Sequence, residues 1–186
     1  MSLTSPTAAL RSASVVGVSG SRAPSLASLA ACQWALGQLA ASAAVVTGCA
    51  SGVDACVRAW CPAARVVHAS AFGGVPAARS VAVVRAVAAS AGLGGAGALW
   101  LAFPSGPCPV GLVPSRSASA CFAGFGSGTW ASLALAVGLG VPCLVGVPAG
   151  VAVPAGWGLA PHPAGSGPGG AWAGFRPAVV QASLFG

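Results

Sequence analysis

Five short apolar runs, rich in β-branched residues, recur along the chain and predict buried strands. The predicted strands are Ser14–Ser19, Ala44–Thr47, Arg65–Ala69, Ala98–Phe103 and Pro142–Val147. Because apolar residues fill these runs instead of alternating with polar ones, each strand is expected to be buried on both faces. Strands of this kind are typical of a parallel sheet that is covered by helices on both sides.

Helix-like stretches separate the predicted strands. They are Ser25–Ala41, Val53–Cys61, Ala77–Ala91 and Gly128–Leu139. Alternating strands and helices imply right-handed βαβ crossovers, so the predicted fold class is α/β. We expect a Rossmann-like, doubly wound, mostly parallel sheet of about five or more strands with helices on both faces. Ligands of such sheets bind at the carboxyl ends of the strands, where the loops after the first, second and fourth strands would converge.

The alternation ends near residue 148, which suggests two regions. Residues 1–148 are predicted to form one Rossmann-like domain, and a chain of 186 residues is long enough for one domain with a real core. Residues 149–186 have little periodicity and much Gly and Pro, so they are predicted to be a C-terminal extension. We expect Trp157, Trp172 and Phe175 to anchor this extension on the domain or on a neighbouring subunit.

The composition is unusually poor in charge. Charged residues make up 5% of the chain, against roughly a quarter in typical soluble domains. All eight basic residues are Arg, and Asp54 is the only acidic residue, which gives a formal net charge of +7. Lys, Glu, Asn, Ile and Tyr are missing; their codons are A/T-rich, so a GC-biased coding sequence explains the choice of Arg over Lys. The charge-poor surface makes a homo-oligomer the expected state.

Other bulk features bear on location and metal binding. The mean hydropathy is +0.86, but glycines and prolines interrupt the best apolar window, residues 128–150, so no membrane span is expected. The first 20 residues lack the pattern of a secretory signal, which makes a cytoplasmic location the expectation. Seven cysteines occur without a CxxC pair, so we expect no zinc site and no cofactor, but buried thiols in a reducing compartment.

The first candidate loop is VVGVSGSRAPS, residues 15–25. Gly20 and Ser21 are small enough for backbone amides to approach an anion at a strand end, and Arg22 adds a charged donor. The loop lacks the lysine of a Walker A motif and the full GxGxxG fingerprint. Phosphate binding and a plain tight turn both remain open here.

The second candidate loop, TGCASGVDA, contains Asp54, the one carboxylate of the chain. Gly48 and Gly52 permit a turn that other residues resist, and Asp54 falls in the first turn of the next helix. Two interpretations remain open: Asp54 stabilises the helix start, or it contacts a ligand group such as a ribose hydroxyl. One carboxylate cannot supply a paired acid and base, so no catalytic residue is predicted.

The third candidate loop is CFAGFGSGTWASLALA, residues 121–136. Gly126, Ser127, Gly128 and Thr129 lead directly into a predicted helix. Free N–H groups point outward at a helix N-terminus and bind phosphate well. A phosphate cradle is favoured over a merely flexible loop, because flexibility does not explain why the small residues stand in front of a helix.

Together, these loops resemble the Rossmann-like superfamily of DNA-processing protein A and the Lonely Guy phosphoribohydrolases (SLOG-type domains), over residues 14–148. Residues 47–54 are similar to its S/T-G-x-A-x-G-x-D motif, and residues 124–132 resemble its P-G-G-x-G-T-x-x-E motif. More loosely, Arg79 and Arg116 resemble arginines that line its pocket. However, Gly124 and Phe125 replace the Pro-Gly start, and Ser132 stands where the Lonely Guy enzymes have a catalytic glutamate.

The resemblance implies a pocket that binds a nucleotide or another phosphorylated small molecule without N-glycosidic cleavage. If the protein is an enzyme, the expected activity is that of a nucleotide or nucleoside-phosphate hydrolase. Two alternatives remain: a DNA-binding protein resembling DNA-processing protein A, or a self-assembling structural protein with a vestigial pocket. The arginines are dispersed singly, so the positive charge reflects missing acids more than a basic patch.

Overall fold

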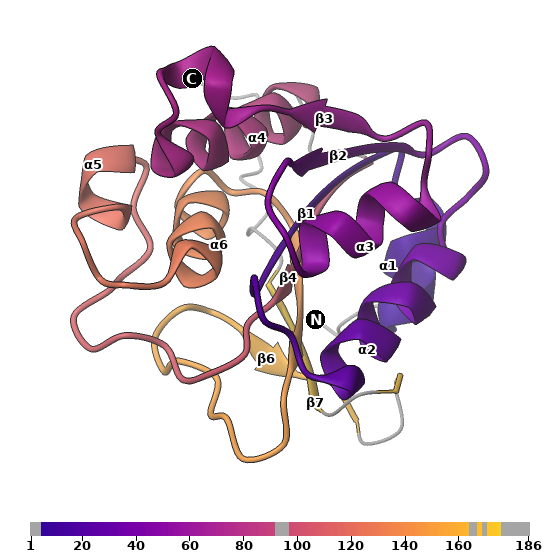
Figure 1. The fold of residues 1–186 in the computed structure, drawn as a ribbon. Coiled ribbons are helices and arrows are strands. Elements are labelled where there is room, and N and C mark those ends of the chain that lie inside the picture. Colours follow the sequence, from indigo (N-terminus) through magenta and orange to yellow (C-terminus); the bar gives the residue numbers. More distant parts are fainter. Residues whose placement is uncertain (1–4, 92–96, 164–166, 169–170, 176–186) are drawn as a thin grey trace, which may run out of the picture.

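The computed structural model describes residues 5–91, 97–163, 167–168 and 171–175. These residues form a seven-stranded, mostly parallel sheet with helices on both faces, which confirms the predicted α/β class (Figure 1). The helices are α1 (Pro6–Ser12), α2 (Leu26–Gly37), α3 (Val53–Trp60), η1 (Ala69–Phe72, a 3-10 helix), α4 (Pro76–Ser90), α5 (Ala118–Cys121) and α6 (Gly128–Gly138). The strands are β1 (Val15–Gly20), β2 (Ala44–Gly48), β3 (Arg65–Val67), β4 (Ala98–Phe103), β5 (Cys143–Val147), β6 (Ala160–Pro161) and β7 (Ala171–Phe175).

The strand order is β3-β2-β1-β4-β5-β7-β6. The first five strands are parallel, and β1 pairs with β4 from Val15↔Ala98 to Gly20↔Phe103. The order of the strands reverses between β1 and β4, because β2 and β3 lie on one side of this pair and β5 on the other. In open α/β sheets, such a switch point leaves a crevice at the carboxyl ends of the strands.

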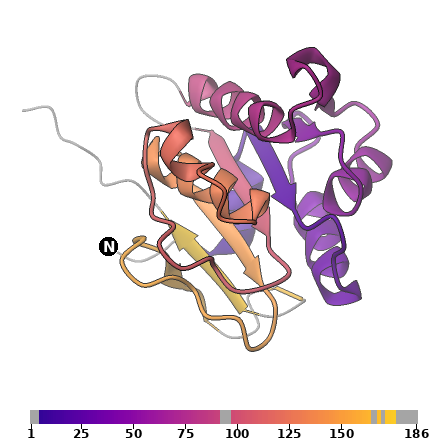
Figure 2. The same cartoon turned by 60° about the vertical axis from the view of Figure 1, so that its left-hand side comes forward.

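Helices cover the sheet on both faces, as Figures 1 and 2 show. Helices α4 and α6 pack on one face, where residues such as Val84 and Leu133 join Trp100 in one core. Helices α1, α2 and α3 pack on the other face, where residues such as Leu10 and Val53 join Leu99. All six residues of β4 are buried, because successive side chains enter opposite cores. This double burial explains the unbroken apolar runs in the sequence.

Local signals and long-range pairing explain where the structure departs from the predicted elements. The third predicted strand, Arg65–Ala69, ends at Val67, and the chain then turns into η1. Helix α1, which we did not predict, begins with Pro6 and is capped by Ser5, whose side chain accepts a hydrogen bond from the Ala8 N–H.

Among the described residues, no helix is long and apolar enough to cross a membrane.

The described part of residues 149–186 contributes to the same sheet. Strand β7 runs antiparallel to β5 with the register Val147↔Ala171 at one end. The Trp172 ring meets Phe103 edge to face at a centroid distance of 5.9 Å, and Trp157 meets Trp130 in the same way at 5.9 Å. The side chain of Phe175 and residues 176–186 lie outside the described residues. A domain division at residue 148 stays a prediction.

Candidate functional site

A cavity of about 590 Å³ opens at the carboxyl ends of the strands, at the switch point between β1 and β4. Nine of the predicted site residues line it: Gly20, Ser21, Arg22, Asp54, Arg79, Gly126, Ser127, Gly128 and Thr129. Gly48 and Gly52 are not part of its wall, but each contacts residues that are. The three loops chosen from the sequence therefore meet at one cavity.

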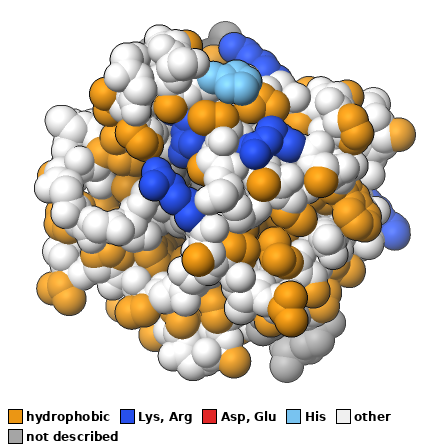
Figure 3. Space-filling model, viewed as in Figure 1, with side chains coloured by type: hydrophobic (Ala, Val, Ile, Leu, Met, Phe, Trp, Pro, Cys, Tyr) orange, Lys and Arg blue, Asp and Glu red, His pale blue; other side chains and the backbone are white. Residues whose placement is uncertain are grey.

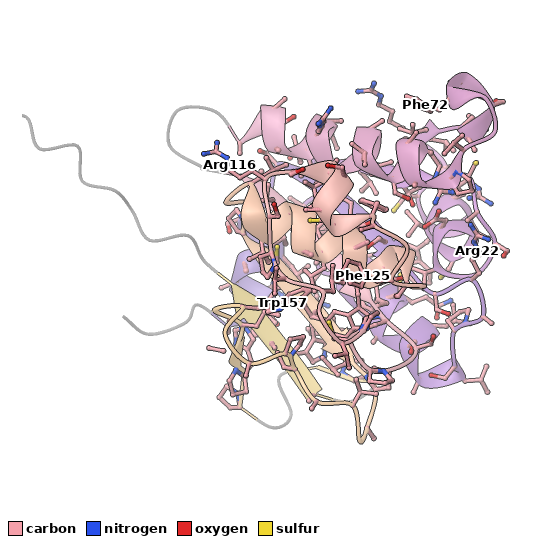
Figure 4. All side chains as sticks on the ribbon, turned by 90° about the vertical axis from the view of Figure 1, so that its left-hand side faces the viewer. Arg22, Phe72, Arg116, Phe125 and Trp157 are labelled. Atoms are coloured by element: carbon pink, nitrogen blue, oxygen red, sulfur yellow. The ribbon has the colours of Figure 1, made fainter. Side chains whose placement is uncertain are left out.

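The loop after β1 is held against the end of β4. The Ser21 N–H donates a hydrogen bond to the Phe103 carbonyl at 3.0 Å. Ser19, at the end of β1, lines the cavity, and its buried hydroxyl has no hydrogen-bond partner among the described residues. The Arg22 side chain lines the cavity and is exposed, and Figure 4 shows it at the right-hand side of the molecule. The loop thus presents an unpaired hydroxyl and a solvent-exposed cation.

The second loop packs directly on the first, and Gly52 is the point of contact. The Val53 N–H donates to the Ser21 carbonyl at 3.0 Å, and the Ser51 hydroxyl donates to the Arg22 carbonyl at 3.4 Å. Gly52 has φ +70°, and a Cβ built there would overlap the Ser21 carbonyl. Both the backbone angle and the lack of space therefore demand glycine.

Asp54 and Arg79 form a largely buried ion pair at one wall of the cavity. Asp54 is 5% exposed, and its Oδ2 accepts the Ala50 N–H at 3.2 Å and lies 3.5 Å from Nη1 of Arg79. Burial raises the pKa of Asp54 above its usual value, while the Arg79 charge and the Ala50 hydrogen bond offset part of this rise. A Cβ at Gly48 would come within 2.5 Å of Asp54 Oδ2, so glycine leaves room for the pair.

Arg79 enters the site from the first turn of α4 and is 9% exposed. Its Nη2 donates to the Ser80 hydroxyl at 3.1 Å, and Ser80 in turn donates to the Pro76 carbonyl at 3.0 Å. Its Nε is buried and has no acceptor among the described residues. An unpaired N–H on a buried guanidinium is costly unless a partner arrives. Among the described residues, the Nε–H of Arg79 is therefore an unsatisfied donor beside the cavity.

Two further side chains surround this pair. Nη1 of Arg58 donates to the Gly48 carbonyl at 2.9 Å and to the Ala50 carbonyl at 3.0 Å, which clamps the second loop. Cys49 accepts the Ala69 N–H on its sulfur at 3.3 Å. This hydrogen bond, together with the nearby Arg79 guanidinium, lowers the pKa of the Cys49 thiol. Neither side chain was singled out from the sequence.

Helix α6 points its N-terminus at the cavity. The Ser127 side chain caps the helix by accepting the Trp130 N–H at 3.4 Å. The N–H groups of Gly128 and Thr129 belong to the first turn, where backbone donors have no acceptor within the helix and carry a partial positive charge. The Ser132 hydroxyl donates to the Gly128 carbonyl at 2.8 Å, so it serves the helix backbone.

The cavity also has an apolar wall, which sequence reasoning did not find. Phe122 and Phe125 line it from the turn between α5 and α6, and Figure 4 labels Phe125.

Trp130 is 1% exposed and donates its Nε1–H to the Gly106 carbonyl at 2.9 Å, so its ring packs in the core. Arg116 is exposed, does not line the cavity and lies across the molecule from Arg22 in Figure 4.

The surroundings of the site are basic. Figure 3 shows basic side chains gathered over the region of α3, α4 and α6, and no acidic side chain is visible on this face. The only acidic residue of the sequence, Asp54, is buried. Within the described ranges, no group of three or more His, Cys, Asp or Glu residues is arranged to hold a metal ion.

Comparison with known proteins found no matching family model, curated protein or solved structure. Membership of the DNA-processing protein A and Lonely Guy superfamily therefore stays a prediction.

Proposed function

We propose that the cavity binds a phosphorylated small molecule, such as a nucleotide, without cleaving it. The observation that supports this most directly is Arg79, a 9% exposed cation on the cavity wall whose buried Nε has no acceptor among the described residues. An anionic oxygen in the cavity would pair with this guanidinium, and charge-assisted hydrogen bonds of guanidinium to phosphate are among the strongest in proteins.

The anionic group has a second set of donors at α6. The first-turn N–H groups of Gly128 and Thr129 and the Ser127 loop line the same cavity as Arg79. A helix N-terminus favours phosphate, because its free N–H groups and its dipole act together. Arg22 at the edge of the cavity adds an exposed charge that attracts the anion from solution.

The remainder of the ligand would meet a mixed surface. Phe122 and Phe125 supply apolar contact area, and Asp54 supplies an acceptor for a hydroxyl group. A volume of about 590 Å³ lies within the usual range for small-molecule pockets, roughly 300–1,000 Å³. A polar molecule with one strongly anionic end and one flatter, less polar end fits this arrangement.

Binding without catalysis is the activity that these residues support. The sequence holds a single carboxylate, so a paired acid and base for glycosidic or phosphoester cleavage is missing. Ser132 occupies the position of the glutamate in the motif that it resembles, and its hydroxyl bonds to the α6 backbone. A hydrolase activity would therefore need chemistry that these residues do not supply.

A thermal-shift screen of the purified protein tests this proposal. The compounds are inorganic phosphate, nucleoside mono-, di- and triphosphates and phosphosugars. A ligand that binds only the folded state raises the stability by RT ln(1 + [L]/Kd), which amounts to about 2.7 kcal/mol at 100 times Kd. Arg79→Ala should lose this shift, whereas Arg85→Ala, an exposed arginine on the same helix that is not part of the cavity wall, should keep it.

The absence of any shift, or a shift that Arg79→Ala retains, would contradict the proposal. DNA binding, the alternative suggested by the net charge of +7, predicts a different result. DNA affinity should then fall steeply with salt, with a log–log slope of several units, because each neutralised phosphate releases counterions. The same salt titration on a small phosphorylated ligand should show a much shallower slope.

Self-association is a second candidate property, favoured by an apolar groove that adjoins the cavity at Pro107. The groove has a volume of about 1,090 Å³ and is lined by residues from two segments, 107–114 and 152–158, and by Val137. Val113, which lines the groove, is 61% exposed, and Val110, in the same segment, is 98% exposed. Exposed apolar side chains next to an apolar groove are typical of protein–protein contacts, and a second copy of this chain is the partner that we propose.

A further inference from the structure

Two neighbouring helices present their first turns to the same cavity. Helices α4 and α6 pack against each other on one face of the sheet, as Figure 1 shows. The cavity wall includes Pro76 and Ala77 from the first turn of α4, and Gly128 and Thr129 from the first turn of α6. Because the first N–H groups of a helix have no acceptor within it, each helix brings free backbone donors to this cavity.

The α4 end of the cavity holds a buried cation in addition to helix donors. No side-chain hydrogen bond caps α4 among the described residues, and the N–H groups of Ala77 and Ala78 have no acceptor within the helix. Arg79 follows them, is 9% exposed, lines the cavity and has a buried Nε without a partner among the described residues. Long side chains of a helix lean toward its N-terminus. The unpaired guanidinium therefore indicates an anion position at this end, independently of the helix donors.

The α6 end of the cavity is a separate position. Ser127 accepts the Trp130 N–H at 3.4 Å, whereas the N–H groups of Gly128 and Thr129 have no acceptor within the helix. Free N–H groups point along the helix axis, so a bound anion lies in line with the axis of its own helix. The axes of packed helices are about 8–10 Å apart. Two anionic groups, one beyond each helix, therefore fit this geometry better than one group shared by both.

We propose that the anionic end of the ligand carries two phosphoryl groups on separate atoms, one beyond α4 beside Arg79 and one beyond α6 at Gly128. This inference rests on the proposed function and narrows the ligand class to bisphosphates, such as nucleoside 3′,5′-bisphosphates. The two phosphoryl groups of a nucleoside diphosphate share one bridging oxygen, so they lie too close together to reach both helix ends. Phosphates on two different carbons of a sugar are several bonds apart.

A nucleoside bisphosphate also matches the other walls of the cavity. Phe122 and Phe125 offer apolar area to a flat base, and the exposed side chain of Arg22 adds a positive charge. Each phosphate monoester carries about −1.5 to −2 charges at neutral pH. Asp54, the only acidic residue of the sequence, is buried and paired with Arg79. No other acidic side chain opposes a ligand of such high negative charge.

The test compares isomeric ligands on the full-length protein. Adenosine 3′,5′-bisphosphate and ADP contain the same atoms and differ only in where the second phosphoryl group is attached. The guanosine pair repeats the comparison with another base, and AMP and GMP are the references. Calorimetric titration in EDTA should show that the 3′,5′-bisphosphate of at least one base binds about tenfold or more tightly than its diphosphate and its monophosphate, because a second charge-assisted contact adds to the first.

Gly128→Pro and Gly128→Ala separate the two positions. Gly128 is the first residue of α6, and Ser127 before it has φ −131° and ψ 105°, an extended conformation that suits a following proline. A Cβ at Gly128 meets nothing within 4 Å, so both variants should fold. Only the proline removes the N–H. Gly128→Pro should therefore lose the advantage of the bisphosphate over the monophosphate, whereas Gly128→Ala should keep it.

The possible outcomes distinguish this inference from the proposed function. The inference is overturned, and the proposed function stands, if the two isomers bind equally well, if the diphosphate binds more tightly, or if Gly128→Pro weakens monophosphate and bisphosphate by the same factor. Binding of inorganic phosphate without any of the nucleotides would also exclude nucleoside bisphosphates. If no compound binds, inorganic phosphate included, the proposed function itself is refuted. The comparison of isomers uses the wild type, so it decides the question even if the proline variant does not fold.

Discussion

The Arg79 guanidinium lies 3.5 Å from the Asp54 carboxylate and joins α4 to α3 at the wall of the cavity. Although the pair is oppositely charged, burial still raises the pKa of Asp54. The folded protein therefore stabilises the charged carboxylate less well than water does. A buried charge that costs stability and faces a cavity is typical of a residue that serves binding.

The first prediction concerns pH. Because the pKa of Asp54 is higher in the folded than in the unfolded protein, the folded state binds more protons in the window just above the ordinary aspartate value of about 4. The contribution of Asp54 to stability therefore decreases as pH rises through this window. Asp54→Asn, which stays uncharged, should be at least as stable as the wild type at neutral pH but should bind ligand more weakly.

Denaturant unfolding from about pH 3 to about pH 7 measures this difference. His162 also titrates in this range, and burial lowers its pKa, so its protonation favours unfolding as pH falls below about 6.5. This contribution is present in both proteins and cancels in their difference. If the wild type lost stability relative to Asp54→Asn on acidification, the sign of the Asp54 shift would be wrong.

The strands and the three loops were predictable because their signals are local. An unbroken apolar run such as Ala98–Phe103 indicates a strand that is buried on both faces, and a glycine such as Gly52 indicates a backbone position where a Cβ does not fit. Strand β7 was not predicted, because its pairing with β5 is non-local and its sequence is rich in small residues. The apolar wall of Phe122 and Phe125 was missed because only the tertiary fold turns these side chains to the cavity.

The role of Arg79 shows a similar limit. Arg79 gave a weak signal as a single arginine near a predicted helix start. Its significance comes from the ion pair and the unpaired Nε, and both are tertiary features.

The second prediction concerns the contact between the first two loops. Gly52→Ala places a Cβ at φ +70° and against the Ser21 carbonyl, so both backbone strain and overlap oppose it. Gly73→Ala has a similar angle, φ +62°, but open space around it. We expect a cost of about 1 kcal/mol for Gly73→Ala and about 3 kcal/mol or more for Gly52→Ala in urea unfolding. Equal costs would show that the contact between the loops contributes nothing.

The third prediction concerns divalent cations. Mg²⁺ in nucleotide sites is usually held by one or two carboxylates together with the phosphates, and the only carboxylate side chain in this protein is paired with Arg79. Phosphate or nucleotide binding should therefore persist in EDTA. Added Mg²⁺ should weaken the affinity for a nucleoside triphosphate, because it masks the charge that the arginines recognise. Calorimetric titration measures the affinity with and without Mg²⁺, and a requirement for the ion would contradict this prediction.

The fourth prediction concerns the apolar groove. If a second copy of the chain covers the groove, Val110→Asp should shift the protein toward monomers, because a charge would be buried without a partner in the interface. Leu26→Asp is the matched control, since Leu26 is 86% exposed but lies on α2, whereas Val110 stands between two residues that line the groove, Pro109 and Gly111. Mass measured by light scattering over a range of concentrations should fall for Val110→Asp alone. A wild-type protein that stays monomeric throughout, or a Leu26→Asp variant that dissociates equally, would show that this groove is not the contact between copies.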